Sequence, residues 1–224
     1  MKSRITVLIV LLSFARFGFA QGFVNLNFET ASINTITNPG GNSYTALVNG
    51  WAANTANYVN GDPTTLPFNN AALDAPAVNL EGTNNTAGPS AIQGNYSIFL
   101  QGGTQTYADF FPGHTNGASI GQSGQIPLTA QSITYWGNAL QVTFNGQMLS
   151  FNAIGSGANY TVYGADISAY AGQTGALVFT TPWLSAGLLD NIQFSSSPVP
   201  EPGGLTLVVT GALLFGFRRW RGLW

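Results

Sequence analysis

The chain has 224 residues and no cysteine. The side chains that could do chemistry are therefore eight carboxylates and a single histidine. The lack of cysteine excludes thiol catalysis, disulfides and zinc–thiolate sites. His114 stands in FPGHTNG, which is a loop pattern, and no G-x-S-x-G motif supplies a nucleophile for it. We therefore interpret His114 as an exposed loop residue. A phosphate-binding loop and a dinucleotide-binding fingerprint are also missing from the sequence.

The carboxylates could work in pairs, as they do in glycoside hydrolysis. Several of them stand beside turn residues, as in Asp62-Pro63, Asp74-Ala75-Pro76 and Glu81-Gly82. Asp favours such positions for backbone reasons. We therefore expect structural roles for these acids and no enzymatic activity. A glycan hydrolase or lyase that uses paired carboxylates stays open as an alternative.

Charge is distributed very unevenly along the chain. All six basic residues lie near its ends, and they are Lys2, Arg4, Arg16, Arg218, Arg219 and Arg221. Between Phe17 and Phe217 there are eight acids and no base, which gives this part a formal charge of −8. Affinity for phosphates requires Lys and Arg, so the sequence excludes nucleic acid as a partner.

Residues 1–20 have the order of a secretory signal peptide. A basic start with Lys2 and Arg4 precedes an apolar run from Ile5 to Phe14, and the small residues Gly18 and Ala20 follow. This order predicts cleavage after Ala20 and export of the protein.

The other end of the chain also resembles a targeting signal. The apolar stretch 205–217 would be about 20 Å long as a helix, which is short for a bilayer core of about 30 Å. Arg218, Arg219 and Arg221 follow it, and arginines in this position typically hold a helix end at the cytoplasmic interface. We expect a short transmembrane helix over 205–217, with these arginines as its stop signal and 218–224 as a cytoplasmic basic tail.

Residues 195–204 form a Ser- and Pro-rich linker that contains Pro200, Glu201 and Pro202. This motif, followed by a short apolar helix and by RRWRG, resembles the PEP-CTERM sorting signal of Gram-negative bacteria. The resemblance covers about 27 residues and implies recognition by exosortase, a membrane-embedded transpeptidase. It implies a precursor that depends on the secretion machinery, is anchored transiently in the inner membrane and then moves to the cell surface or an extracellular polysaccharide matrix. A plain C-terminal anchor behind a proline spacer is the alternative.

The body, residues 21–194, reads as an antiparallel two-sheet β-sandwich. Short alternating segments are separated by Gly, Asn and Pro, and no stretch keeps a helical period. Asn145-Gly146 predicts a type I′ hairpin turn between 140–144 and 147–151, with Val142 and Leu149 on its apolar face. We expect long loops over 33–86, and the other strands expected are 23–29, 95–101, 132–137, 160–164, 176–181 and 188–194.

A second resemblance concerns the body itself. NFE at 27–29, NGW at 49–51, GADISAYAGQTGALVFTT and LLDNIQF are similar to the galactose-binding-like jelly roll of carbohydrate-binding modules. The resemblance implies a structural calcium ion shared by Glu29 and Asp190. Separately, alternation in LLDNIQF puts Asp190 on the side of Leu188, Ile192 and Phe194. A buried carboxylate far from any Lys or Arg must bind a metal ion, accept backbone hydrogen bonds or be protonated.

Aromatic residues are the remaining candidates for binding. Trp51, Trp136 and Trp183, together with several tyrosines, could stack on sugar rings, although core packing is the more common use of such side chains. The sequence thus predicts a non-enzymatic surface or matrix protein that needs no cofactor other than structural calcium. A carbohydrate-binding module with polysaccharide as its partner is the alternative.

Overall fold

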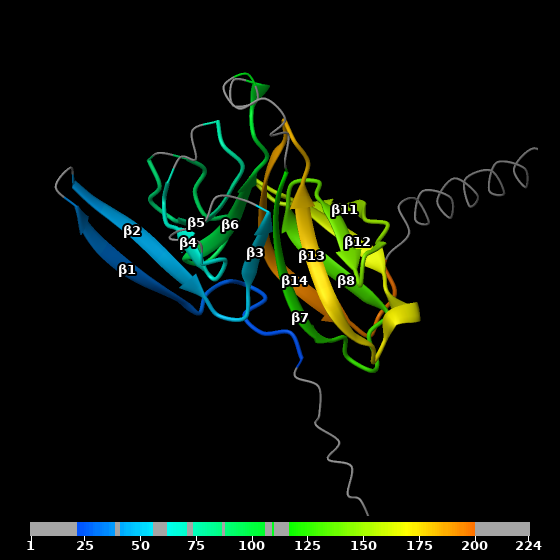
Figure 1. Cartoon of the computed structure of the whole chain (residues 1–224). Helices are drawn as coiled ribbons and strands as arrows, with labels where there is room; N and C mark the ends of the chain where they lie inside the picture. Colours follow the sequence, from blue (N-terminus) through cyan, green and yellow to red (C-terminus); the bar gives the residue numbers. More distant parts are fainter. Residues whose placement is uncertain are drawn as a thin grey trace, which may run out of the picture.

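The structure is a computed structural model that describes residues 22–38, 41–55, 62–70, 74–86, 88–105, 109 and 117–199. This part of the chain is all-β (Figure 1). Its strands are β1 (Ala31–Asn38), β2 (Gly41–Val48), β3 (Ala52–Thr55), β4 (Thr65–Pro67), β5 (Ala77–Gly82), β6 (Tyr96–Gln101), β7 (Ala118–Gln125), β8 (Ser132–Gly137), β9 (Gln141–Phe144), β10 (Gln147–Met148), β11 (Asn152–Ser156), β12 (Thr161–Asp166), β13 (Thr174–Thr181) and β14 (Ala186–Ser195). A short 3-10 helix covers Ser168–Tyr170.

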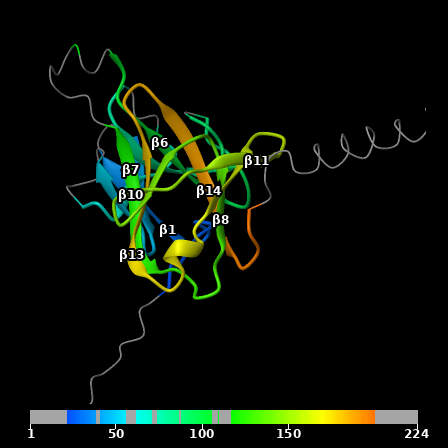
Figure 2. The same cartoon turned by 90° about the vertical axis from the view of Figure 1, so that its right-hand side faces the viewer.

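Two large sheets form the sandwich that the sequence predicts. One has the order β10-β9-β13-β7-β3 and the other has the order β11-β12-β8-β14-β6-β5. All pairs between these strands are antiparallel. Figure 2 shows the two layers from the side, with β7, β10 and β13 in one and β8, β11 and β14 in the other.

The core lies between these two sheets because alternate residues of the strands turn inward. Leu80, Ile98 and Leu189 come from neighbouring strands of the six-stranded sheet and are fully buried. Tyr135 of this sheet meets Phe179 of the other sheet edge to face, with ring centroids 5.5 Å apart. The inward aromatic rings thus join the two layers into a single hydrophobic core.

The predicted Asn145-Gly146 hairpin is confirmed. Phe144 pairs with Gln147, and Thr143 pairs with Met148. Asn145 and Gly146 have φ values of 49° and 77°, as a type I′ turn requires. Val142, Phe144 and Leu149 are buried, so the predicted apolar face is the inner one.

Other expectations were confirmed in part. β6, β8, β12, β13 and β14 occupy the expected segments. The expected strand over 23–29 is wrong, because this segment forms no strand: an isolated bridge at Gly22 precedes it, and it contains a turn and left-handed residues at Asn25 and Phe28. The expected long loops over 33–86 are also wrong, since β1 to β5 lie there.

The prediction that side chains alternate strictly between the two faces of the last strand is wrong as well. The register of β14 against β8 shifts between Asp190 and Gln193, and Asn191 has a φ of 45°. This β-bulge brings Leu189 and Ile192 into the core, whereas Leu188 is only half-buried. The prediction that Asp190 is buried is nevertheless confirmed, because its side chain is 1% exposed.

A smaller third sheet, which we call the arm, has the order β1-β2-β4. β1 and β2 pair over their full length, from Ala31 with Val48 to Asn38 with Gly41. The arm projects from one side of the sandwich in Figure 1. β2 lies in its middle, so β1 forms its outer edge.

The predicted targeting segments, 1–20 and 200–224, lie outside the described residues. Within the described part, no helix has the length and apolar character needed to cross a membrane. The last strand ends at Ser195, and the chain is described as far as Val199.

Candidate functional site

The two acids singled out by the sequence lie beside the same small pocket. Its cavity of about 140 Å³ is lined by Asn27, Glu29, Gln93, Gly94, Asp190 and Asn191. Glu29 belongs to the segment before β1, whereas Asp190 stands at the bulge of β14. Residues 161 positions apart in the sequence are thus brought together, as the resemblance to the jelly-roll family implies.

Asp190 is buried and fully supplied with hydrogen-bond donors. Its Oδ2 accepts hydrogen bonds from Ser97 Oγ at 2.8 Å and from the backbone N–H of Gln93 at 3.3 Å. Its Oδ1 accepts one from the N–H of Asn191 at 2.6 Å. Burial raises the pKa of Asp190 to about 6, and the charge of Glu29 adds to this rise while the three hydrogen bonds oppose it.

Glu29 is held by the turn that leads into β6. Its Oε1 accepts hydrogen bonds from the backbone N–H groups of Asn95 at 2.9 Å and Tyr96 at 3.2 Å, and its Oε2 accepts one from Asn95 Nδ2 at 2.9 Å. Gly94 has a φ of 62°, and a Cβ at this position would overlap the Glu29 carboxylate. A glycine is therefore needed for the turn to approach this closely.

The pocket suits a small hard cation better than a sugar. Two carboxylates together with the side-chain oxygens of Asn27 and Asn191 are ligands that calcium prefers. Its volume of about 140 Å³ lies below the range of about 300 Å³ and more that is typical of ligand pockets. Among the described residues, no three His, Cys, Asp or Glu side chains gather closely enough to bind a metal ion. A cation here would thus depend on amide and backbone oxygens besides the two acids.

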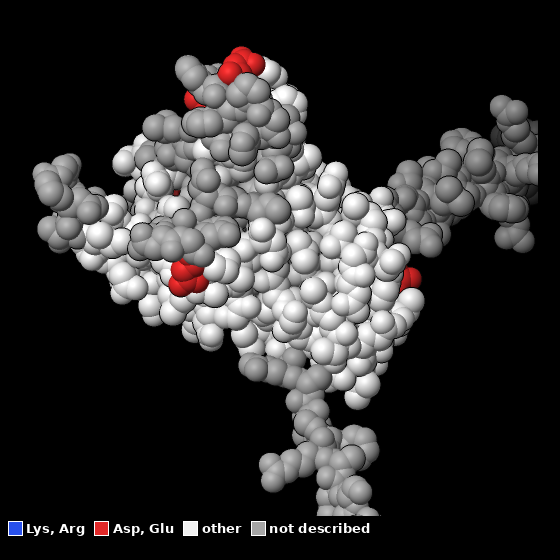
Figure 3. All heavy atoms as spheres, viewed as in Figure 1, with Lys and Arg blue, Asp and Glu red and all other residues white. Residues whose placement is uncertain are grey.

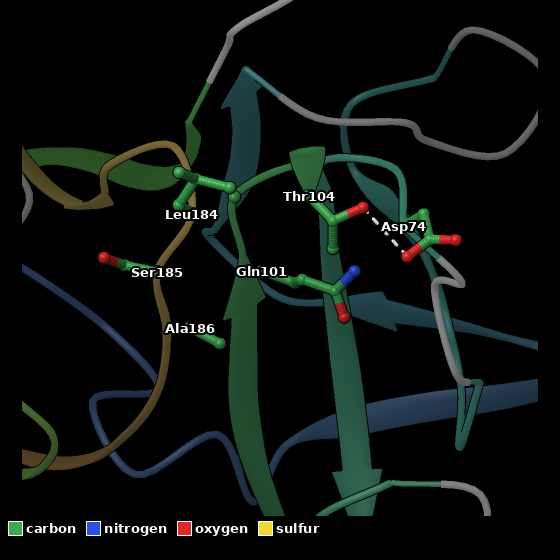
Figure 4. A pocket seen from close by; sticks show the side chains of 7 residues that line it. Asp74, Gln101, Thr104, Leu184, Ser185 and Ala186 are labelled. Atoms are coloured by element: carbon green, nitrogen blue, oxygen red, sulfur yellow. Dashed lines mark hydrogen bonds between the residues drawn. The ribbon is translucent and has the colours of Figure 1, made fainter. Parts of the chain in front are cut away.

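A second, larger pocket lies between the end of β6 and the start of β14. It has a volume of about 340 Å³, and Figure 4 shows Leu184 and Ser185 on one side, Asp74 and Thr104 on the other, and Gln101 between them. Thr104 Oγ1 donates to Asp74 Oδ1 at 2.8 Å, and Gln101 Nε2 donates to the carbonyl of Ala75 at 3.2 Å. These side chains can accept and donate hydrogen bonds but offer no positive charge.

Two residues of this pocket have strained backbones. Asp74 and Leu184 have φ values of 67° and 63°, which are unfavourable for residues with a Cβ. Leu184 occupies a tight turn in which the N–H of Ser185 bonds to the carbonyl of Pro182, and its side chain is 56% exposed. Strain of this kind tends to occur at functional sites.

No family model, curated protein or solved structure matches this chain.

The three tryptophans have different surroundings. Trp51 is 2% exposed and packs against Phe28, with ring centroids 5.3 Å apart, so it belongs to the core. Trp136 is half-buried and stacks on Tyr160 with centroids 4.4 Å apart and planes 8° apart. The buried indole N–H of Trp183 has no partner among the described residues. Trp136 and Trp183 thus stay candidates for binding, whereas Trp51 does not.

Sequence reasoning missed the buried acid Glu81. This side chain of β5 has no exposed surface, and its Oε2 accepts a hydrogen bond from Asn85 Nδ2. Its Oε1 has no partner among the described residues, and the same holds for the buried Oδ1 of Asn79. Burial raises the pKa of Glu81 to about 8. From the sequence, the neighbouring Gly82 placed Glu81 in an expected turn at the surface. Every residue of β5 is nevertheless buried.

The surface agrees with the charge distribution found in the sequence. On the face seen in Figure 3, acids form separate patches, and none of the described residues is Lys or Arg. His114 and the sorting motif Pro200, Glu201 and Pro202 lie outside the described residues, as do Arg218, Arg219 and Arg221. Just before that motif, the carbonyl of Ser197 accepts a hydrogen bond from Ser132 Oγ at 2.7 Å.

Proposed function

We propose that this chain is an exported PEP-CTERM-type protein that exosortase recognises and processes. It serves as a non-enzymatic component of the cell surface or of an exopolysaccharide matrix, with a jelly-roll-like sandwich as its body. The signal peptide directs the chain across the inner membrane, the helix 205–217 anchors it there for a time, and removal of the tail releases it.

One structural observation supports this proposal most directly. The strands of the sandwich end shortly before the sorting motif: β14 stops at Ser195, the carbonyl of Ser197 still accepts a hydrogen bond from Ser132, and Val199 lies beside Gly164. A processing enzyme could therefore cut at the motif without opening the fold. The body left behind would be acidic and contain no Lys or Arg.

Mass spectrometry of the protein isolated from its own host tests this proposal. We expect a chain that begins near Gln21, ends near Pro200–Pro202 and lacks Arg218 to Trp224. A Glu201→Ala variant should retain the tail, whereas the matched variant Asp166→Ala, at an exposed acid, should lose it normally. A mature protein that keeps its C-terminal arginines would contradict the proposal.

A carbohydrate-binding role is the second candidate, and the pocket in Figure 4 favours it. Its volume of about 340 Å³ is that of a ligand site. Asp74 keeps its Oδ2 without a hydrogen bond among the described residues and could accept sugar hydroxyls, while the exposed Leu184 could contact an apolar sugar face. A carboxylate without a neighbouring cation favours neutral sugars over acidic ones.

A glycan array with the full chain in detergent tests this role. We expect binding to neutral glycans that Asp74→Asn abolishes and that Asp166→Asn, an equal charge change at an exposed acid elsewhere, leaves intact. Binding that survives Asp74→Asn would refute this pocket as the site, and no binding to any neutral glycan would refute the role.

We also propose that Glu29 and Asp190 bind a structural calcium ion. Bound calcium stabilises the folded state alone, so it should raise the melting temperature of the full chain. The rise should disappear in Glu29→Gln and persist in Asp166→Asn. The absence of a calcium-dependent rise in the unaltered chain would overturn the site.

A further inference from the structure

The outer strands of the three sheets differ in how their free edges are protected. An unprotected edge offers unpaired N–H and C=O groups to another chain, so natural proteins shorten, bulge or cover their edges. Most edges of this protein follow that rule. β10 has two residues, and β4 has three and ends in Pro67.

Bulges or neighbouring segments protect three further edges. β11 shifts register between Ala153 and Gly155. β3 shifts between Ala53 and Thr55, and the N–H of Ala53 bonds to the carbonyl of Pro63. The edge of β5 is covered by Phe68, which forms a bridge with Leu80.

β1 is the exception among the described edges. It has eight residues, all paired with β2 without a register shift, and contains neither proline nor a charged residue. Ser32, Asn34 and Thr35 expose their side chains, and among the described residues no hydrogen bond joins the outer edge of β1 to another segment. The arm carries this edge away from the sandwich in Figure 1.

Charge indicates which partner this edge fits. The body, residues 21–194, has a formal charge of −7, so two copies repel each other over most of their surfaces. Residues 30–61, which include all of β1 and β2, contain no charged residue. Two arms can thus approach each other without bringing acids of the two strands together.

We propose that β1 pairs with β1 of a second copy of this chain in an antiparallel manner. The pairing is isologous, as a two-fold axis requires, and it joins two arms into one sheet with the order β4-β2-β1-β1-β2-β4. This self-association goes beyond the proposed function and does not depend on processing of the tail.

Light scattering of the full chain in detergent, corrected for bound detergent, measures the association. We expect a concentration-dependent dimer that Asn34→Lys with Thr35→Lys weakens by about tenfold or more, because like charges meet across the paired edges. The matched control is Ser43→Lys with Tyr44→Lys, on the middle strand opposite the same region. Both variants reduce the net negative charge, so a general charge effect would strengthen both dimers.

Cross-linking provides a readout that does not depend on lysine variants. The chain contains no cysteine, so a single introduced cysteine can form a disulfide only with another copy. Thr35→Cys or Asn34→Cys should give a covalent dimer on mild oxidation, and Ser43→Cys should not. A monomeric full chain, a dimer that both lysine variants affect alike, or cross-linking that is equal at Thr35 and Ser43 would each overturn the proposal.

Discussion

Asp190 and Glu81 are both buried acids of the six-stranded sheet, and they lie on either side of β6. Ser97 of β6 is the register partner of Glu81 and donates its hydroxyl to Asp190. Neither acid has a basic partner, because the sequence between Phe17 and Phe217 contains none. Their hydrogen-bond donors, however, differ.

Three donors converge on Asp190, whereas among the described residues Glu81 has one donor, Asn85 Nδ2, and an Oε1 without a partner. The pKa of Asp190 rises to about 6 and that of Glu81 to about 8. At pH 7, Asp190 is therefore mostly ionised and Glu81 mostly protonated. The comparison shows that the supply of donors, and not burial alone, decides which carboxylate keeps its charge.

The largest expected effect is a difference between two amide variants. Asp190→Asn places an NH₂ group among N–H and O–H donors, so we expect it to reduce the free energy of unfolding by about 3 kcal/mol or more. Glu81→Gln replaces an acid that must take up a proton to fold at pH 7 by an amide that is always neutral, so it should raise that free energy by roughly 3 kcal/mol. Urea unfolding of the full chain at pH 7 with a calcium chelator, followed by tryptophan fluorescence, measures both.

Equal losses in the two variants would contradict this comparison, because they would mean that Glu81 is ionised in the folded protein. A harmless Asp190→Asn would show that the three donors do not act on a charged carboxylate.

The sequence predicted those parts of the fold in which local pattern and tertiary context agree. The Asn145-Gly146 hairpin and the apolar strands β6, β8 and β13 belong to this group. β7, with the sequence ASIGQSGQ, was missed because, apart from Ile120, small and polar residues occupy its inward positions; Gln122 is buried and bonds to the backbone of Val24. The arm was missed because Thr- and Asn-rich strands resemble loops in composition.

The candidate site was predictable to a similar degree. A carboxylate in an apolar strand without any base in the body signalled the burial of Asp190. That Asp190 lies close to Glu29 was predicted only by a family resemblance, because no local sequence pattern links residues so far apart. Glu81 gave no such signal, since its burial depends on segments that fold over β5 from elsewhere in the chain, as Asn85 and Phe68 do.

The next effect concerns pH. The pKa of Glu81 is higher in the folded state than its ordinary value of 4.5, so its contribution is fully present below pH 4.5 and is lost as pH rises to about 8. Asp190 likewise loses its stabilising contribution to the folded state as pH rises to about 6. Above about pH 6, the remaining loss of stability comes from Glu81, whose raised pKa is the higher of the two.

Between pH 6 and 8, the free energy of unfolding should therefore fall by about 1.4 kcal/mol per pH unit. Glu81→Gln should make this range nearly flat, whereas Asp166→Asn, at an exposed acid, should keep the slope. Thermal unfolding at a series of pH values measures it. A slope that persists in Glu81→Gln would show that another group is responsible.

The smallest effect tests the serine between the two acids. Ser97 Oγ donates to Asp190 and accepts the N–H of Ile92 at 2.8 Å, so Ser97→Ala should cost about 1–2 kcal/mol and raise the pKa of Asp190 further. Ser132→Ala removes a bond to the backbone carbonyl of Ser197, beyond the end of β14, and should cost about 1 kcal/mol or less. NMR titration of the Asp190 carboxyl carbon separates the two, because Ser132→Ala should leave that pKa unchanged. If Ser97→Ala also left it unchanged, the serine hydroxyl would not help to keep Asp190 ionised, and the contrast with Glu81 would need another cause.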